Sequence, residues 1–122
     1  MATVIARETL PRSATAYQFQ GEQFGDVGVS FFMVDAPPGG GPKLHTHPYT
    51  EVFVIHEGNL TFTVGHETIE ATAGQILIVP PNTPHKFTNT GTTHARHTDI
   101  HTANAMRTTW LEPYPPSDTP TH

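Results

Sequence analysis

The sequence contains no cysteine and few basic residues. Without thiols the chain can form neither disulfides nor a cysteine-ligated zinc site. Lysine and arginine total 6 against 11 aspartates and glutamates, which gives a formal net charge of −5, and the basic residues form no run. Because a nucleic-acid surface needs a basic patch, we expect no nucleic-acid partner.

Long apolar segments are also missing. No apolar run approaches the ~18 residues of a membrane-spanning helix. The N-terminal stretch shows neither the apolar core nor the small-residue cleavage site of a secretory signal. We therefore expect no membrane association and a cytoplasmic location. At 122 residues the chain suffices for one domain, spanning 1–122, with a core of its own.

Proline and glycine, by contrast, are abundant, at 12 and 10 residues. They separate short runs rich in β-branched and aromatic residues, and no internal repeat is present. This pattern predicts an all-β, single-domain chain of about eight to ten short strands, arranged as a jelly roll or closed barrel. We expect the core to span about residues 15–112, with an extended arm or edge strand over 1–14 and a loose tail over 113–122.

Some strand-like runs are apolar at both odd and even positions, such as VGVSFFMVDA (27–36), EVFVI (51–55) and ILIV (76–79). A strand that is apolar on both faces is usually covered on both, so we expect something to pack outside the barrel. Since the chain is short, a second copy could supply the cover, and we expect a homodimer. Residues 104–113 predict a short helix or an irregular segment anchored by Trp110 and Leu111.

Histidine is the most informative residue that is present in quantity. His45, His47 and Glu51 fall within seven residues, and His85 follows a proline-bounded turn. Side chains two apart in a strand share a face, so His45 and His47 point the same way before Pro48-Tyr49-Thr50 turns the chain. Two imidazoles and a carboxylate on one face form a ligand set that borderline divalent metals accept.

The spacing of these residues resembles the paired motifs of the cupin superfamily. The first motif places Gly, His-x-His, Glu and Gly at Gly39, His45, His47, Glu51 and Gly58. The second places Gly, Pro-x-Gly, His and Asn at Gly74, Pro80, Asn82, His85 and Asn89, with Asn82 in place of the glycine. Because Asn is the commonest non-glycine residue at positive φ, we expect the turn to persist.

The resemblance implies a cupin-type double-stranded β-helix that holds one divalent transition metal ion through His45, His47, Glu51 and His85. Three neutral nitrogens and one carboxylate suit Mn, Fe, Co, Ni, Cu or Zn, and disfavour Ca or Mg. Four protein ligands on an octahedral ion leave two positions for water or substrate, as a catalytic site requires.

Two further groups of residues are candidates for the site. In ARHTDIH (95–101) His97, Asp99 and His101 share one face; we expect it to meet solvent while Ile100 packs inside. In the opposite orientation, Asp99 or His101 becomes a candidate general acid or base. His56 has the opposite parity to Glu51 and should point outward. Phe53, Phe62 and Phe87 are predicted to line the barrel, both as core and as the wall of a small-ligand pocket.

The leading hypothesis is a metal-dependent enzyme that acts on a small, oxygen-bearing substrate. The resemblance implies dioxygenase, isomerase or lyase chemistry, with a dioxygenase-like reaction first among them. Glu51 is then both a metal ligand and a candidate base. The alternative is a non-catalytic barrel in which the metal anchors a small ligand for binding or sensing. An acid or base in the cavity beyond the four ligands would favour the enzyme.

Overall fold

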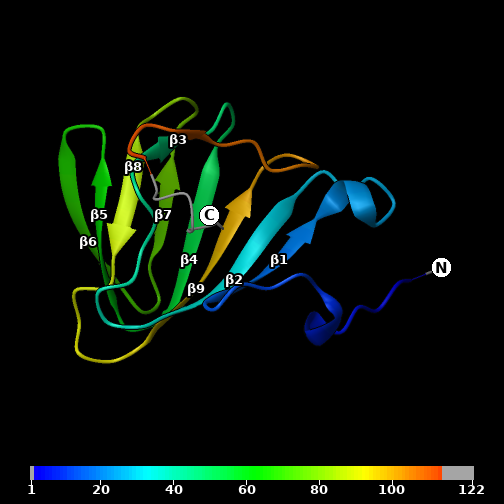
Figure 1. The fold of residues 1–122 in the computed structure, drawn as a ribbon, viewed down its shortest axis with the longest axis horizontal. Helices are drawn as coiled ribbons and strands as arrows, with labels where there is room; N and C mark the ends of the chain where they lie inside the picture. Colours follow the sequence, from blue (N-terminus) through cyan, green and yellow to red (C-terminus); the bar gives the residue numbers. More distant parts are fainter. Residues whose placement is uncertain (1, 114–122) are drawn as a thin grey trace.

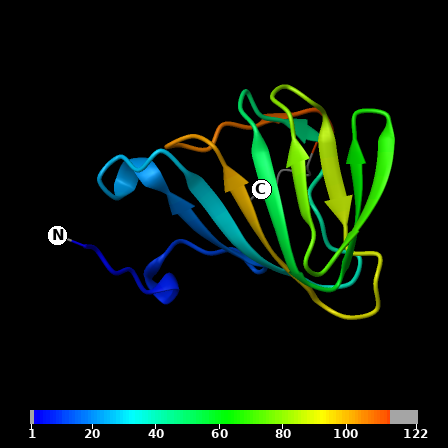
Figure 2. The ribbon, with the colours of Figure 1, turned by 180° about the vertical axis from the view of Figure 1, so that it is seen from behind.

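A computed structural model describes residues 2–113, so the expected tail over 113–122 lies almost entirely outside the described part of the chain. Two five-stranded antiparallel sheets face each other (Figures 1 and 2), which confirms the all-β jelly-roll prediction. Among the described residues no helix is long and apolar enough to cross a membrane. The helical pieces are the single 3-10 turns η1 (Arg7–Thr9) and η2 (Gly21–Gln23).

The strands of each sheet come from both halves of the chain. Sheet A has the order β1-β2-β9-β4-β7, and sheet B the order β10-β3-β8-β5-β6. The strands of sheet A are β1 (Ala16–Gln20), β2 (Ser30–Ala36), β9 (Ala95–His101), β4 (Glu51–Glu57) and β7 (Ile76–Val79). Those of sheet B are β10 (Thr109–Trp110), β3 (His45–Thr46), β8 (His85–Thr88), β5 (Asn59–Val64) and β6 (Glu67–Thr72).

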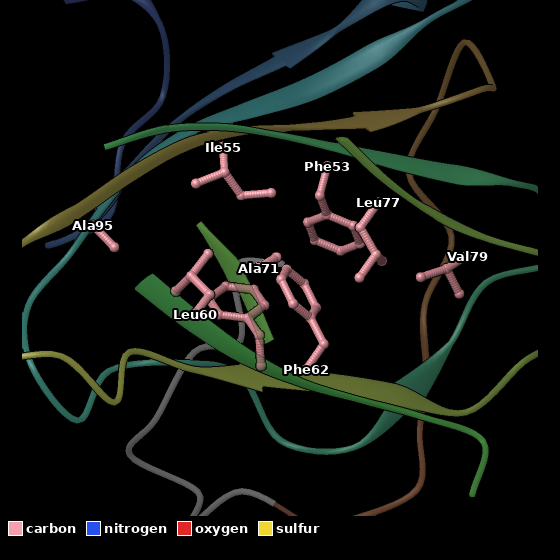
Figure 3. Packing of buried hydrophobic residues seen from close by; sticks show 9 residues of the cluster. Phe53, Ile55, Leu60, Phe62, Ala71, Leu77, Val79 and Ala95 are labelled. Carbon is pink, nitrogen blue, oxygen red and sulfur yellow. The ribbon is translucent and has the colours of Figure 1, made fainter. Parts of the chain in front are cut away.

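The core lies between the sheets and follows from the alternation along each strand. Phe53 of β4 packs edge-to-face on Phe62 of β5, with ring centroids 4.9 Å apart, and Phe87 of β8 lies 5.6 Å from Phe62. Figure 3 shows Phe53 and Ile55 of one sheet pointing toward Leu60 and Phe62 of the other. Each of these side chains is at most 2% exposed, so their burial supplies much of the hydrophobic stabilisation.

The prediction for the 95–101 strand was wrong. His97, Asp99 and His101 point into the sandwich and are at most 1% exposed, whereas Ile100 lies on the outer face. Each of these side chains has a polar neighbour there, although Nε2 of His97 is buried without a hydrogen-bond partner among the described residues. His97 Nδ1 is hydrogen-bonded to Asp99 Oδ1, and His101 lies opposite Glu51 in the β4–β9 register. Burial of a polar group is tolerated when it is paired, and hydropathy along one strand does not reveal such partners.

The described part of this single chain does not itself cover the outer face of these strands, so a cover supplied by a second copy stays a prediction. Ile76 and Ile78 of β7 are 65% and 64% exposed, and β2 begins only at Ser30, which leaves Val27 and Val29 exposed. In this chain the continuous apolar runs therefore form strands with one buried face. No other part of the described chain packs over the exposed side chains on their outer face.

The two ends of the described chain differ in detail from the expectations. Within 104–113 the chain is irregular, one of the two predicted alternatives, apart from the two-residue strand β10, whose Trp110 packs on the ring of His45 at 4.9 Å. Leu111, expected to be an anchor, is 48% exposed. The N-terminal arm is extended apart from η1, and its Leu10 is buried. Beyond the 3-10 turn, Arg12 forms an isolated bridge with Tyr17 of β1.

Candidate metal centre

Four side chains converge at one end of the sandwich. His45 belongs to β3, His47 follows it directly, and Glu51 and His85 are the first residues of β4 and β8. Their ligand atoms all lie within 4.8 Å of one another, and each residue is at most 2% exposed. In the β3–β8 register, His45 and His85 are direct neighbours. The structure thus brings together all four residues that the sequence offers as ligands.

The backbone fixes the tautomer of the three histidines. The Nδ1 atoms lie 2.7 Å from the carbonyl of Lys43 for His45, 2.7 Å from that of Arg107 for His47, and 2.8 Å from that of Thr83 for His85. A carbonyl oxygen only accepts hydrogen bonds, so each Nδ1 carries the proton and donates it. Each Nε2 therefore presents a lone pair toward the centre, as metal-ligating imidazoles do.

Glu51 completes a set of acceptors with no proton between them. Its Oε1 lies 3.1 Å from Nε2 of His47 and 3.0 Å from Nε2 of His85. With the protons on Nδ1, these buried atoms are all acceptors that face one another, and such an arrangement is unfavourable unless a cation is shared among them. The donor set therefore fits a divalent transition metal, which takes neutral imidazole nitrogen and carboxylate oxygen.

The buried surroundings hold His45 and Glu51 in the protonation states that can bind a metal. Burial, reinforced by the neighbouring His85, lowers the pKa of His45 to about 3. For Glu51, burial raises the pKa, but hydrogen bonding to neighbouring imidazole, chiefly that of His101, outweighs it and holds the pKa well below its usual range. At neutral pH the centre thus combines a neutral His45 imidazole with an ionised Glu51 carboxylate.

A second layer of polar contacts orients Glu51. The backbone N–H of Arg107 donates to the Tyr49 hydroxyl at 3.1 Å, and that hydroxyl is hydrogen-bonded to Nδ1 of His101. Burial raises the pKa of Tyr49 to about 12, so the phenol keeps its proton and donates it to His101 Nδ1. The His101 proton then sits on Nε2, which lies 3.2 Å from Oε2 of Glu51. One carboxylate oxygen is thereby held while the other faces the histidines.

Tyr49 is the site residue that sequence reasoning missed. The sequence predicts only a turn over Pro48-Tyr49-Thr50, although the Tyr49 ring also stacks on His47 with centroids 5.2 Å apart. Its hydroxyl reaches His101, 52 residues away in the chain. No local pattern indicates a contact over that separation.

The remaining predicted residues fall into three places. Asp99 is two residues along β9 from His101 and is engaged by His97; it does not belong to the four-residue cluster. Phe53 reaches the centre, with its ring 6.2 Å from that of His85, and contacts the other two phenylalanines of the predicted pocket, Phe62 and Phe87. His56 is exposed, as expected, and is hydrogen-bonded to Thr98.

The protein is a small β-sandwich of two facing antiparallel sheets. At one end it buries three histidines and one carboxylate that could together hold a metal ion. The chain belongs to the Cupin_2 family, described as a cupin domain, whose model matches residues 32–101. This segment includes every residue of the cluster.

Two curated proteins share part of the sequence. An uncharacterised protein of Methanocaldococcus jannaschii is 40% identical over 68 residues, which cover 52% of this chain and 54% of that protein. The polyketide synthase CurC of Streptomyces cyaneus is 40% identical over 60 residues, which cover 48% of this chain and 39% of that protein. The chain thus spans about half or less of the length of these relatives.

Several solved structures share the fold. A Bacillus subtilis oxalate decarboxylase with Mn(II) centres matches 85% of this chain and 30% of its own, with a TM-score of 0.76 and 23% identity. An oxalate oxidase matches 88% of this chain and 63% of its own, with a TM-score of 0.74 and 20% identity. At such identities the likeness establishes the fold alone.

Proposed function

We propose that this chain is a metal-dependent enzyme that acts on a small, oxygen-bearing substrate at the His45, His47, Glu51 and His85 centre. The observation that carries the proposal is the fixed tautomer of the three histidines, which directs three Nε2 lone pairs and one carboxylate oxygen to a common point. Such preorganisation for a cation is costly in a purely structural core.

A divalent transition ion would be held by these four residues, and Mn is the first to test, because a structural neighbour has Mn(II) centres. When bound, an ion of this kind supplies Lewis-acid polarisation of a substrate oxygen and, if it is redox-active, electron transfer to dioxygen. Fe, Co, Ni, Cu and Zn suit the same donor set.

Side chains around the ion would orient the carboxylate, accept a proton and shape the substrate pocket. His101 holds Oε2 of Glu51, so that Oε1 stays toward the centre and the carboxylate is a candidate proton acceptor from a substrate carbon or hydroxyl. Tyr49 fixes His101 in the tautomer that makes this contact. Phe53 forms an apolar wall beside His85, which favours a small substrate with few polar groups besides its ligating oxygens.

The substrate class that this arrangement suits best is a carboxylate, diol or enolate able to occupy two positions on the ion. Two structural neighbours are named for oxalate, a dicarboxylate, which supports testing small carboxylates first. A dioxygenase-like reaction is the leading subclass, and an isomerase or lyase reaction differs from it by needing no dioxygen.

The proposal is tested by measuring substrate loss and dioxygen uptake with Mn-loaded and Fe-loaded protein over a panel of small carboxylates, diols and enolisable ketones. The decisive variant is Glu51→Gln, which keeps one ligating oxygen but removes charge and basicity. It should retain bound metal and lose turnover per metal by about 10²-fold or more, as expected for loss of a general base. His56→Gln, which changes an exposed histidine outside the centre, should match wild type.

A non-catalytic ligand-binding barrel is the second candidate. It is favoured by the engagement of Asp99 with His97, which removes one of the two extra acid–base groups that the sequence offered. In that case the metal-loaded protein would bind members of the panel, seen as changes in the spectrum of the bound metal, and would turn over none of them. Turnover per metal in Glu51→Gln equal to that of wild type would remove Glu51 as base and leave it as a ligand only.

A further inference from the structure

The outward-facing side chains of the two sheets differ sharply in polarity. On sheet B the outward positions are occupied by threonine, asparagine, glutamate and lysine. They are Thr46, Asn59, Thr61, Thr63, Thr68, Glu70, Thr72, Lys86, Thr88 and Thr109. This is the polar surface expected of a sheet whose outer face meets water.

The outer face of sheet A is apolar across all five strands. The strand registers place its side chains in two rows that run from one edge of the sheet to the other. The first row is Phe19, Phe31, Ile100, Val52 and Ile78, and the second is Tyr17, Met33, Thr98, Val54 and Ile76. We call these residues the ten-residue face. All except Thr98 are aliphatic, aromatic or thioether side chains.

Strand formation alone does not require this composition. Threonine is also a strong strand former, and the chain uses it at the corresponding positions of sheet B. Nevertheless Ile76 and Ile78 are 65% and 64% exposed, and the other eight residues of the face are only partly buried. A contiguous apolar surface of this kind marks an association site.

We propose that the ten-residue face is the interface for a second copy of this chain, related by a two-fold axis. The charge distribution favours a copy of itself, because none of the ten residues is charged although the chain carries a net charge of −5. When a face meets itself, any charge on it is brought near an equal charge, and the ten-residue face avoids this cost. Interfaces between identical chains are also the most apolar class.

The border of the face has the polar character of an interface rim. Arg96 lies 3.8 Å from both Asp35 and Glu57 just beyond the second row, and His94 is paired with Asp35 at 2.7 Å. Charged groups thus gather at the margin of the face and not within it. Because these ion pairs are exposed, they contribute little to stability but can select the orientation in which two copies meet.

The N-terminal arm adds a raised edge to the face. Arg7 and Arg12 lie over the ring of Tyr17, at 5.5 Å and 5.1 Å from its centroid. A cleft of about 680 Å³ lies between the arm and the second row; Tyr17, Met33 and Thr98 line it from the face, and charged residues such as Arg7, Asp35 and Arg96 line it from the arm and the margin. The residues that precede Arg7 extend away from the body of the molecule (Figure 1), and Val4 among them is 96% exposed. A second copy therefore meets a hollowed surface with a projecting apolar segment, and this holds whatever reaction the metal centre performs.

The first test compares solution masses by light scattering from about 1 to 100 µM. The wild-type chain of 13.3 kDa should run at twice that mass. Ile76→Lys combined with Ile78→Lys should raise the dimer dissociation constant at least 100-fold, since it places charge in the interface. The matched control is Thr68→Lys combined with Thr72→Lys, which adds the same charge to the edge strand of sheet B and should stay dimeric.

A second test does not depend on the folding of the lysine variants. Because the wild-type chain has no cysteine, a protein–protein disulfide formed by a single introduced cysteine must join two copies of the chain. Thr98→Cys, in the middle strand of the face, should cross-link far more than Thr63→Cys on sheet B. A monomeric wild type at 100 µM, equal masses for the two lysine variants when both are folded, or cross-linking of Thr98→Cys no greater than that of Thr63→Cys would each overturn the proposal.

Discussion

At the scale of single residues, His45 makes the stability of the metal-free protein depend on pH. Its pKa falls from 6.5 to about 3 because it is buried beside other imidazoles. Between these values the unfolded chain binds a proton that the folded chain does not. The stabilising effect of a neutral His45 is therefore complete above about pH 6.5 and is lost progressively as the pH falls.

We expect the free energy of unfolding of the metal-free protein to fall by up to ~1.4 kcal/mol per pH unit below pH 6.5 through this residue. Urea unfolding at pH 7, 6 and 5 measures the slope. His45→Gln should flatten it, whereas His56→Gln, at an exposed position, should leave it unchanged. A slope in His45→Gln as steep as that of wild type would contradict the assignment.

Tyr49 acts on the centre only through other residues. Its hydroxyl links the Arg107 backbone to His101, which holds Glu51. Tyr49→Phe keeps the ring stacked on His47 and removes the hydroxyl alone. Partners of this kind typically change metal affinity by 10- to 100-fold, so we expect Mn affinity, measured by competition with a chelator, to fall about 10-fold with the fold retained.

The matched control is Tyr17→Phe, which removes a hydroxyl on the outer face of sheet A. If Tyr49→Phe binds Mn as tightly as Tyr17→Phe does, Tyr49 has no positioning role. A loss of affinity in Tyr49→Phe that accompanies loss of the folded circular-dichroism spectrum would point to a structural role instead.

At the scale of elements, the turn between β7 and β8 is hydrogen-bonded to the segment that carries His47, and it leads directly into His85. Asn82 has φ 58°, in the left-handed region, and its backbone N–H donates to the carbonyl of His47 at 2.7 Å. The turn that precedes His85 therefore also holds the segment that carries His47. The sequence predicted this conformation, because asparagine tolerates positive φ better than other non-glycine residues.

This geometry predicts an order of stability for substitutions at the turn. Asn82→Gly should leave the free energy of unfolding nearly unchanged, whereas Asn82→Ala should lower it by about 1 kcal/mol and Asn82→Val by about 1–2 kcal/mol, because alanine and valine lack the short polar side chain that lets asparagine adopt positive φ. Urea unfolding of the three variants checks the order. Equal stability of the glycine and valine variants would show that the turn relaxes.

Strand β9 shows why the inner and outer faces could not all be assigned from sequence. Alternation separates His97, Asp99 and His101 from Ile100, but it does not say which set is buried. The choice depends on Glu51, which lies opposite His101 in the register, and on the His97–Asp99 pair. The ligands were predictable because their spacing within two short segments carries the information, whereas these cross-strand contacts appear only in the folded sheet.

At the scale of the whole molecule, the two sheets take different roles. Sheet B contributes His45 and His85, and sheet A contributes Glu51 together with His101. The metal centre therefore lies across both sheets at one end, over an apolar core (Figure 3) that does not include it. For this reason we expect removal of one ligand to empty the centre without unfolding the domain.

The measurement that tests the account most directly is the metal content of purified protein after loading with Mn and removal of free ions. We predict one ion per chain in wild type and in His56→Ala, and at least a tenfold lower content in His47→Ala and His85→Ala, all four giving the same folded circular-dichroism spectrum. Metal content in His47→Ala and His85→Ala equal to that of wild type would contradict the assignment of the centre.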